Sequence, residues 1–132
     1  MELIRRDSDY ALRALSFMAR YPNGERFTIK TIATKQAIPT EFLKKIFQRL
    51  SSDNIVGSRP GPGGGYYLTK SPSNISFKDV IQSVQGRVFL NSCLMEKNFC
   101  GRQDSCQTRK KLHNIQRQID TLLSRSKFEE II

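Results

Sequence analysis

Apolar residues recur at three- and four-residue intervals in three segments of the N-terminal half of the chain. This period predicts amphipathic helices over residues 9–20, 29–36 and 40–53. A Pro-Asn-Gly run at 22–24 is expected to end the first helix, and the proline at position 39 suits the start of the third. The residues expected to face the core are Ala11, Ala14, Leu15, Met18, Ile29, Ile32, Ala33, Phe42, Leu43, Ile46, Phe47 and Leu50.

Polar side chains beside the expected helix starts are candidates for N-caps. Asp7 or Ser8 is expected to cap the first helix, Thr28 the second, and Ser76 a further short helix over residues 77–83. Each carries a side-chain oxygen that can accept a hydrogen bond from the unpaired amides of the first helical turn. The sequence therefore predicts four short helices before its cysteine-bearing segment.

The second and third predicted helices are separated by a short break, and the outer face of the third is polar and basic. This arrangement is typical of a helix-turn-helix, whose second helix enters the major groove of DNA. Glu41 can accept a hydrogen bond from a cytosine amino group, whereas Lys45 and Arg49 suit phosphate contacts. The candidate DNA-binding residues on this helix are Thr40, Glu41, Lys44, Lys45 and Gln48.

Two strand-like segments, 54–59 and 65–70, flank the run Pro60-Gly-Pro-Gly-Gly-Gly65. A basic hairpin directly after a helix-turn-helix is the layout of a winged helix, and its glycines let the backbone approach another surface. The run has neither the Lys-Ser/Thr ending of a P-loop nor the dinucleotide-binding pattern. The wing residues expected to meet DNA are Arg59, Gly63, Gly64 and Tyr66.

The segment from 106 to 125 is expected to be one long helix with a narrow apolar stripe. A stripe with heptad-like steps needs a partner surface, and the same helix of a second subunit would supply it. Packing back on its own domain is the alternative. The predicted dimer interface consists of Leu112, Ile115, Ile119 and Leu122.

These patterns predict a mainly α-helical protein with a small β-wing. We expect a winged helix-turn-helix domain over residues 1–86, a cysteine-bearing loop over 87–107, and a dimerisation helix with its tail over 108–132. The net charge of +10 indicates a polyanionic partner. With no apolar leader and no run long enough to span a membrane, we expect a cytoplasmic protein that does not enter membranes. No catalytic constellation is evident, so an enzyme is not expected.

All three cysteines of the chain, Cys93, Cys100 and Cys106, fall within fourteen residues. An odd number argues against a disulfide framework, and in a reducing compartment clustered thiols more often bind metal or sense redox state. Three ordinary thiols remain the alternative. The cysteine-bearing segment is therefore the main candidate for a sensory site.

The chain resembles the IscR/NsrR family of bacterial iron–sulfur transcription regulators, the Rrf-two family. The match is carried by three segments, followed by the clustered cysteines and a long helix: Asp9-Tyr-Ala-Leu-Arg-Ala-Leu15, Phe42-Leu-Lys-Lys-Ile-Phe-Gln-Arg-Leu50 and Gly61-Pro-Gly-Gly-Gly-Tyr-Tyr-Leu68. The resemblance implies a homodimeric winged-helix protein that binds double-stranded DNA at a pseudo-palindromic operator. It also implies promoter affinity that depends on a bound iron–sulfur cluster, of four or two irons, with repression as the expected action.

Cysteine thiolates are the usual ligands of such clusters, and three of them leave a fourth position to another residue. Some family members use a histidine three residues after the last cysteine, but Arg109 stands there. His113 is seven residues after Cys106, about 10 Å along the helix. Other members use an acidic residue of the first helix, donated by the other subunit. By the motif match this residue is Asp9, with Asp7 as its neighbour, and helix capping is the alternative role for both.

Other occupants and functions stay open. Zinc could take three cysteines and one further ligand, although a Cys-x-x-Cys pair is absent. A regulator of the same fold could instead sense through thiol oxidation or through a partner, without a cluster. A basic RNA-binding module is a third possibility, and preference for structured RNA over duplex DNA would identify it.

Overall fold

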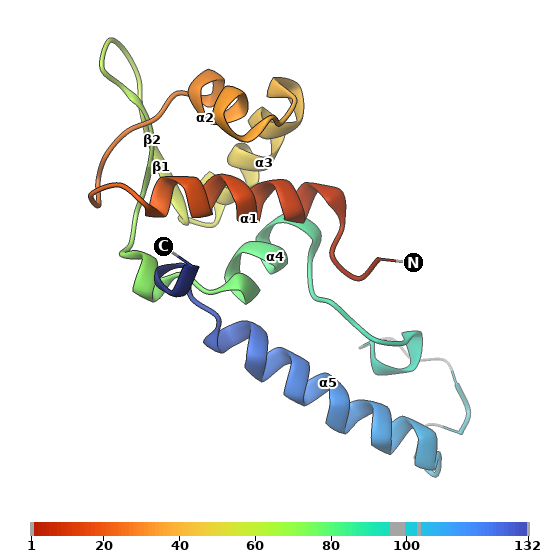
Figure 1. The fold of residues 1–132 in the computed structure, drawn as a ribbon. Coiled ribbons are helices and arrows are strands. Elements are labelled where there is room, and N and C mark those ends of the chain that lie inside the picture. Colours follow the sequence, from red (N-terminus) through yellow and green to blue (C-terminus); the bar gives the residue numbers. More distant parts are fainter. Residues whose placement is uncertain (1, 96–99, 103, 132) are drawn as a thin grey trace.

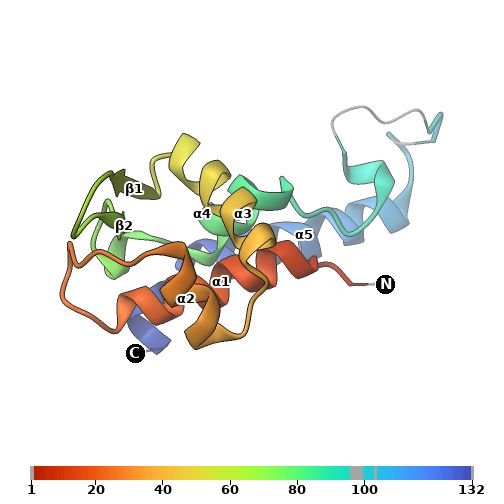
Figure 2. The same ribbon diagram turned by 90° about the horizontal axis from the view of Figure 1, so that it is seen from above.

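The computed structural model describes residues 2–95, 100–102 and 104–131 of the chain. A helical head carries a two-stranded wing at one end, and a long helix runs along its underside (Figure 1). The start of the first helix and the cysteine-bearing segment lie at the end opposite the wing in both views (Figure 1, Figure 2). In chain order the elements are α1 (Arg6–Ala19), α2 (Ile29–Gln36), α3 (Thr40–Ser52), β1 (Val56–Arg59), β2 (Gly65–Leu68), η1 (Pro72–Asn74), α4 (Phe77–Gln85), η2 (Ser92–Leu94), α5 (Gln107–Arg125) and η3 (Phe128–Ile131).

The predicted fold class, mainly helical with a β-wing and a long C-terminal helix, is confirmed. Helix α2 has the predicted bounds, and Thr28 caps it by accepting a hydrogen bond from the Thr31 amide at 3.1 Å. Ser76 caps α4 in a capping box with Asp79, as the side chain of each residue accepts from the backbone amide of the other. Local sequence therefore sets these helix starts.

Helix α1 begins earlier than predicted, at Arg6, so the expected capping by Asp7 or Ser8 is wrong. The cause is a residue distant in sequence. Gln85 accepts a hydrogen bond from the Arg5 amide at 2.9 Å and donates to the Leu3 carbonyl at 2.9 Å. This clamp holds the N-terminal segment extended up to Arg5 and fixes the point at which the helix starts.

The expected core positions are buried or half-buried with one exception. Phe42 was predicted to face the core but is 54% exposed, whereas Leu43, Ile46, Phe47 and Leu50 of the same helix are buried. Position 42 lies at the margin of the apolar stripe, where its ring meets only the edge of the Tyr10 ring, with 6.3 Å between centroids. The helical period alone does not show how wide a stripe the neighbouring elements cover.

The wing strands pair antiparallel, with Val56 opposite Leu68 and Arg59 opposite Gly65. Phe27 forms a further bridge with Tyr66, through mutual backbone hydrogen bonds of 2.8 and 2.7 Å. Gly65 has φ +132°, and a Cβ there would lie 2.5 Å from the Phe27 carbonyl oxygen. A glycine at this position is therefore what lets Phe27 attach the wing to the head.

The C-terminal segment returns from α5 to the head. The Phe77 amide donates to the Ser126 carbonyl at 2.8 Å, and Phe128 is 1% exposed, with its ring 5.0 Å from that of Phe77. The tail assigned to the dimerisation segment thus contributes to the core of the head, and α5 is attached to the head at its C-terminal end. Within the described ranges, no helix has the length and apolar character needed to cross a membrane.

The burial of Phe128 can be tested against the exposed ring of Phe42. Phe128→Ala removes a fully buried aromatic ring and is expected to lower the free energy of unfolding by about 3–5 kcal/mol. Phe42→Ala, the matched control, should cost less than about 1 kcal/mol. Urea unfolding followed by circular dichroism measures both, and equal losses would contradict the assignment of Phe128 to the core.

Candidate nucleic-acid interface and cysteine-bearing segment

The outer face of α3 carries every residue predicted to read DNA from this helix. All of these side chains are exposed, and the Lys44 ammonium lies 3.5 Å from the Glu41 carboxylate, one helical turn away. This exposed pair contributes little to stability and can separate when another anion or donor approaches. The face comprises Thr40, Glu41, Lys44, Lys45 and Gln48.

The predicted wing residues differ in how exposed they are to solvent. Arg59 is exposed at the end of β1, and Gly63 is exposed at the tip with φ +72°. Gly64 lies so close to the hairpin backbone that a Cβ would be 2.1 Å from the Arg59 carbonyl oxygen. Tyr66 is half-buried. Its ring forms a T-shaped pair with that of Phe47, with 5.0 Å between the ring centroids, so Tyr66 packs against the head. Of the predicted wing residues with a side chain, Arg59 is exposed and Tyr66 is half-buried.

A cavity of about 380 Å³ lies between the start of α1 and α3. Sequence reasoning did not single out Arg5 and Arg6, which line it together with Lys45 and Arg49. Arg49 is engaged there by donating to the Val84 carbonyl. The sequence signal for this basic flank is the adjacent pair Arg5-Arg6 at the start of the first helix.

The two acidic residues of the first turn of α1 differ in their contacts and exposure. Asp7 accepts hydrogen bonds from Arg5 at 2.7 Å and from the Ser8 amide at 2.9 Å. Partial burial, the largest influence, raises the pKa of Asp7, but the Arg5 and Ser8 hydrogen bonds and the Arg5 charge together lower it below its ordinary value. Asp9 is 57% exposed and has only a long ion pair with Arg13, at 3.8 Å. Asp9 is therefore the more exposed of the two carboxylates.

In the first turn of α5, Arg109 forms hydrogen bonds with two of the cysteines. Cys106 is the N-cap of α5, and its sulfur accepts a hydrogen bond from the Arg109 amide at 3.4 Å. The Arg109 side chain in turn donates from Nε to the Cys93 carbonyl at 3.1 Å. Cys93 and Cys106 are half-buried and Cys100 is exposed. Arg109, noted only as a substitute for histidine, thus ties together the two ends of the segment.

The described residues of a single copy do not bring together three or more His, Cys, Asp or Glu side chains that could hold a metal ion. His113 is exposed on α5. Residues 96–99 and 103, inside the predicted loop over 87–107, lie outside the described residues. The donor types nevertheless suit a thiolate-bound cluster, because three thiols stand on one short segment beside a helix N-terminus, which favours negative charge.

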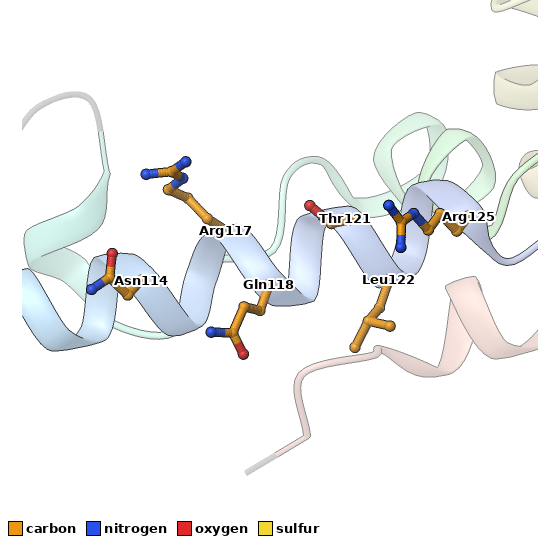
Figure 3. Close-up of a pocket in the computed structure, with 6 residues that line it drawn as sticks. All are labelled: Asn114, Arg117, Gln118, Thr121, Leu122 and Arg125. Carbon is orange, nitrogen blue, oxygen red and sulfur yellow. The ribbon is translucent and has the colours of Figure 1, made fainter.

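The predicted dimer stripe on α5 is partly open. Ile115 is 47% exposed and Leu122 is 63% exposed, whereas Leu112 and Ile119 are half-buried. A hollow of about 550 Å³ lies along this helix, and its lining residues come from α5 alone (Figure 3): Asn114, Arg117, Gln118, Thr121, Leu122 and Arg125. Large exposed apolar side chains one heptad apart are typical of a surface that another helix covers.

Comparisons with known proteins agree with this geometry. The family model described as "Rrf2: Iron-dependent Transcriptional regulator" matches residues 4–132. The chain is 30% identical to the HTH-type transcriptional regulator IscR of Photorhabdus laumondii, over 93% of this chain and 74% of the relative. It shares its fold with the global cysteine regulator CymR of B. subtilis (TM-score 0.82, 21% identity, 99% of this chain and 96% of that one). It also shares its fold with T. potens IscR (TM-score 0.75, 20% identity, 97% and 84%). The chain belongs to the Rrf2 family of transcriptional regulators, which bind DNA and are not enzymes.

Proposed function

We propose that this regulator binds promoter DNA as a homodimer and that an iron–sulfur cluster held by Cys93, Cys100 and Cys106 controls the binding. The observation that carries the proposal is the attachment of Cys93 and Cys106 to Arg109 at the start of the predicted dimerisation helix. The iron-dependence in the family description and the likeness to IscR support it. Asp9 of a second copy is proposed as the fourth ligand.

For DNA recognition, α3 is proposed to enter the major groove while the wing meets the backbone or the minor groove. Glu41 and Lys44 would exchange their mutual ion pair for base edges, and Lys45 would contact phosphate. A dimer formed through α5 would present two such heads related by a two-fold axis. Its operator would then be pseudo-palindromic, because protein symmetry is mirrored in the two half-sites.

In the cysteine-bearing segment, the cysteines would bind the cluster, Arg109 would orient the segment, and Asp9 would link the cluster to the head of a second copy. A bound cluster with one non-cysteine ligand supplies a labile iron position that small oxidants or exchange reactions can reach. Cys93 and Cys106 would hold it at the first turn of α5, where Arg109 fixes the Cys93 backbone. Asp9 lies on α1, which packs against α3. If Asp9 of one copy ligates the cluster of the other, loss of the cluster would act on the head that carries Asp9.

A second candidate function uses the same head without a cluster. Because the described residues of one copy contain no assembled metal-ligand group and Cys100 is exposed, reversible thiol oxidation could carry the signal instead. The shared fold with a global cysteine regulator is compatible with this version. The two functions differ in whether iron and sulfide copurify with the protein.

DNA binding by α3 can be tested at Lys44. Lys44→Ala is expected to weaken operator binding by about 1–3 kcal/mol, since the variant removes a direct contact at the centre of the helix. Lys111→Ala, an exposed lysine of α5, is the matched control and should bind as the wild type does. Fluorescence anisotropy across a salt series measures both. Affinity that neither falls with salt nor responds to Lys44→Ala would contradict the placement of α3 in the groove.

Cluster ligation can be tested by anaerobic purification with iron and sulfide quantified and the visible absorbance recorded. Each of Cys93→Ala, Cys100→Ala and Cys106→Ala is expected to lose most of the cluster. Asp9→Ala should yield a cluster that decays faster in air, whereas Asp7→Ala should not, because the Asp7 carboxylate is bound to Arg5. A colourless wild-type protein that cannot be reconstituted would favour the thiol-based function, and normal decay in Asp9→Ala would exclude Asp9 as a ligand.

A further inference from the structure

The segment that joins the head to the cysteines is held along α5 by polar side chains. At its start, the Arg87 guanidinium pairs with the Asp120 carboxylate at 3.2 Å. At its end, Arg109 donates to the Cys93 carbonyl at 3.1 Å. As the segment runs from 87 to 93, its partners on α5 run backwards from 120 to 109. The segment therefore lies antiparallel to the helix and is attached to it at both ends.

Between these attachments, Gln116 clamps the backbone of the segment. Its Nε2 donates to the Val88 carbonyl at 2.7 Å, and its Oε1 accepts from the Leu90 amide at 2.9 Å. The same Nε2 also lies 3.2 Å from the Asp120 carboxylate, which links the clamp to the Arg87 ion pair. One amide thus occupies the place that a neighbouring β-strand would take.

Gln116 is 2% exposed and is the buried residue of α5 among those that the structure describes. Its side chain faces the segment over residues 87–93. A buried amide is costly unless its donors and acceptor are paired, and here both ends of the side chain are. A leucine of similar size would fill the same volume without making these bonds. The amide chemistry therefore fixes the position of the segment rather than adding apolar burial.

The clamp stands between the two functional regions of the chain. On one side, α4 ends at Gly86 with φ +90°, directly before Arg87. On the other side, Cys93 lies three residues beyond Leu90, and Cys106 caps the same α5 that carries Gln116. A displacement of the cysteines relative to α5 must therefore either be absorbed at Gln116 or pass on to α4 and the head.

We propose that Gln116 is a positioning residue that couples the state of the cysteine-bearing segment to the DNA-reading head. This inference rests on the proposed function, in which the cysteines are the sensory site. With the clamp closed, Val88 and Leu90 move with α5. Without the clamp, the Arg87 and Arg109 attachments at the two ends remain, and the cysteines can shift without moving α4.

The test compares operator affinity of cluster-loaded and cluster-free protein in the wild type, Gln116→Leu and a matched control, Gln82→Leu, whose glutamine is exposed on α4. In the wild type the two affinities should differ by a factor typical of coupled sites, about 5–150-fold. In Gln116→Leu the ratio should fall below about 3-fold, with iron and sulfide content and dimer mass unchanged. Gln82→Leu should keep the wild-type ratio.

Hydrogen exchange of the cluster-free proteins supplies a readout that does not depend on the cluster. The Leu90 amide, which donates to Gln116, should exchange faster in Gln116→Leu, whereas amides of α3 should exchange as in the wild type. Should Gln116→Leu fail to fold, Asp120→Ala takes its place. It removes the Arg87 pair and one contact of Gln116, and it should lower the affinity ratio in part.

The outcomes separate the inference from the function on which it rests. A wild-type affinity that does not change with the cluster would overturn the proposed function, and the inference with it. A wild-type ratio that persists unchanged in Gln116→Leu, or in Asp120→Ala if that variant is used, would overturn the inference alone. A reduced ratio with normal cluster content, and with the exchange change confined to the segment around Leu90, supports it.

Discussion

The head is built around α1, and the close packing of that helix constrains everything else. Ala11 and Ala14 are fully buried on it, and side chains this small let neighbouring elements approach its backbone. Helices α2, α3 and α4, strand β2 and the C-terminal η3 all contact α1. Helix α3, the wing and the returning chain end are therefore positioned against one rigid element. A force on the exposed side chain of Asp9, in the first turn of α1, would reach α3 through this packing.

The sequence predicts well those features that local chemistry decides. The bounds of α2, the caps Thr28 and Ser76, the wing glycines and the exposed face of α3 follow from period, capping and turn chemistry, which act within a few residues. The features it missed depend on distant partners. The start of α1 is set by Gln85, which is 80 residues from Arg5, and Phe128 enters the core only because the chain returns to Phe77. Phe42 shows the same limit, since the coverage of a stripe depends on what packs beside it.

Two glutamines solve the same physical problem near the C-terminal end of α4. Gln85 bonds the backbone of residues 3 and 5, and Gln116 bonds that of residues 88 and 90. In each case an extended segment lies beside a helix, where no strand can pair with it, and its amides and carbonyls would otherwise lose their partners. A side-chain amide places N–H donors and a carbonyl acceptor side by side, so one residue can pair with both a backbone carbonyl and a backbone amide. Because glutamine is also a common surface residue, composition and period could not mark either one.

Helix α5 has a polar face that contacts its own chain and an exposed face that carries apolar residues. This division explains why its apolar stripe is narrow. Gln116 and Asp120, one turn apart, bind the segment over residues 87–93 through polar contacts that hold a fixed register. Ile115 and Leu122 point elsewhere and remain exposed. A dimer built on this second face would join two heads through helices that the glutamine clamp keeps in register with α4. Apolar packing alone tolerates sliding, whereas directional hydrogen bonds do not. A polar inner face therefore suits the proposed role of α5, in which a small displacement of the cysteines is carried to the head.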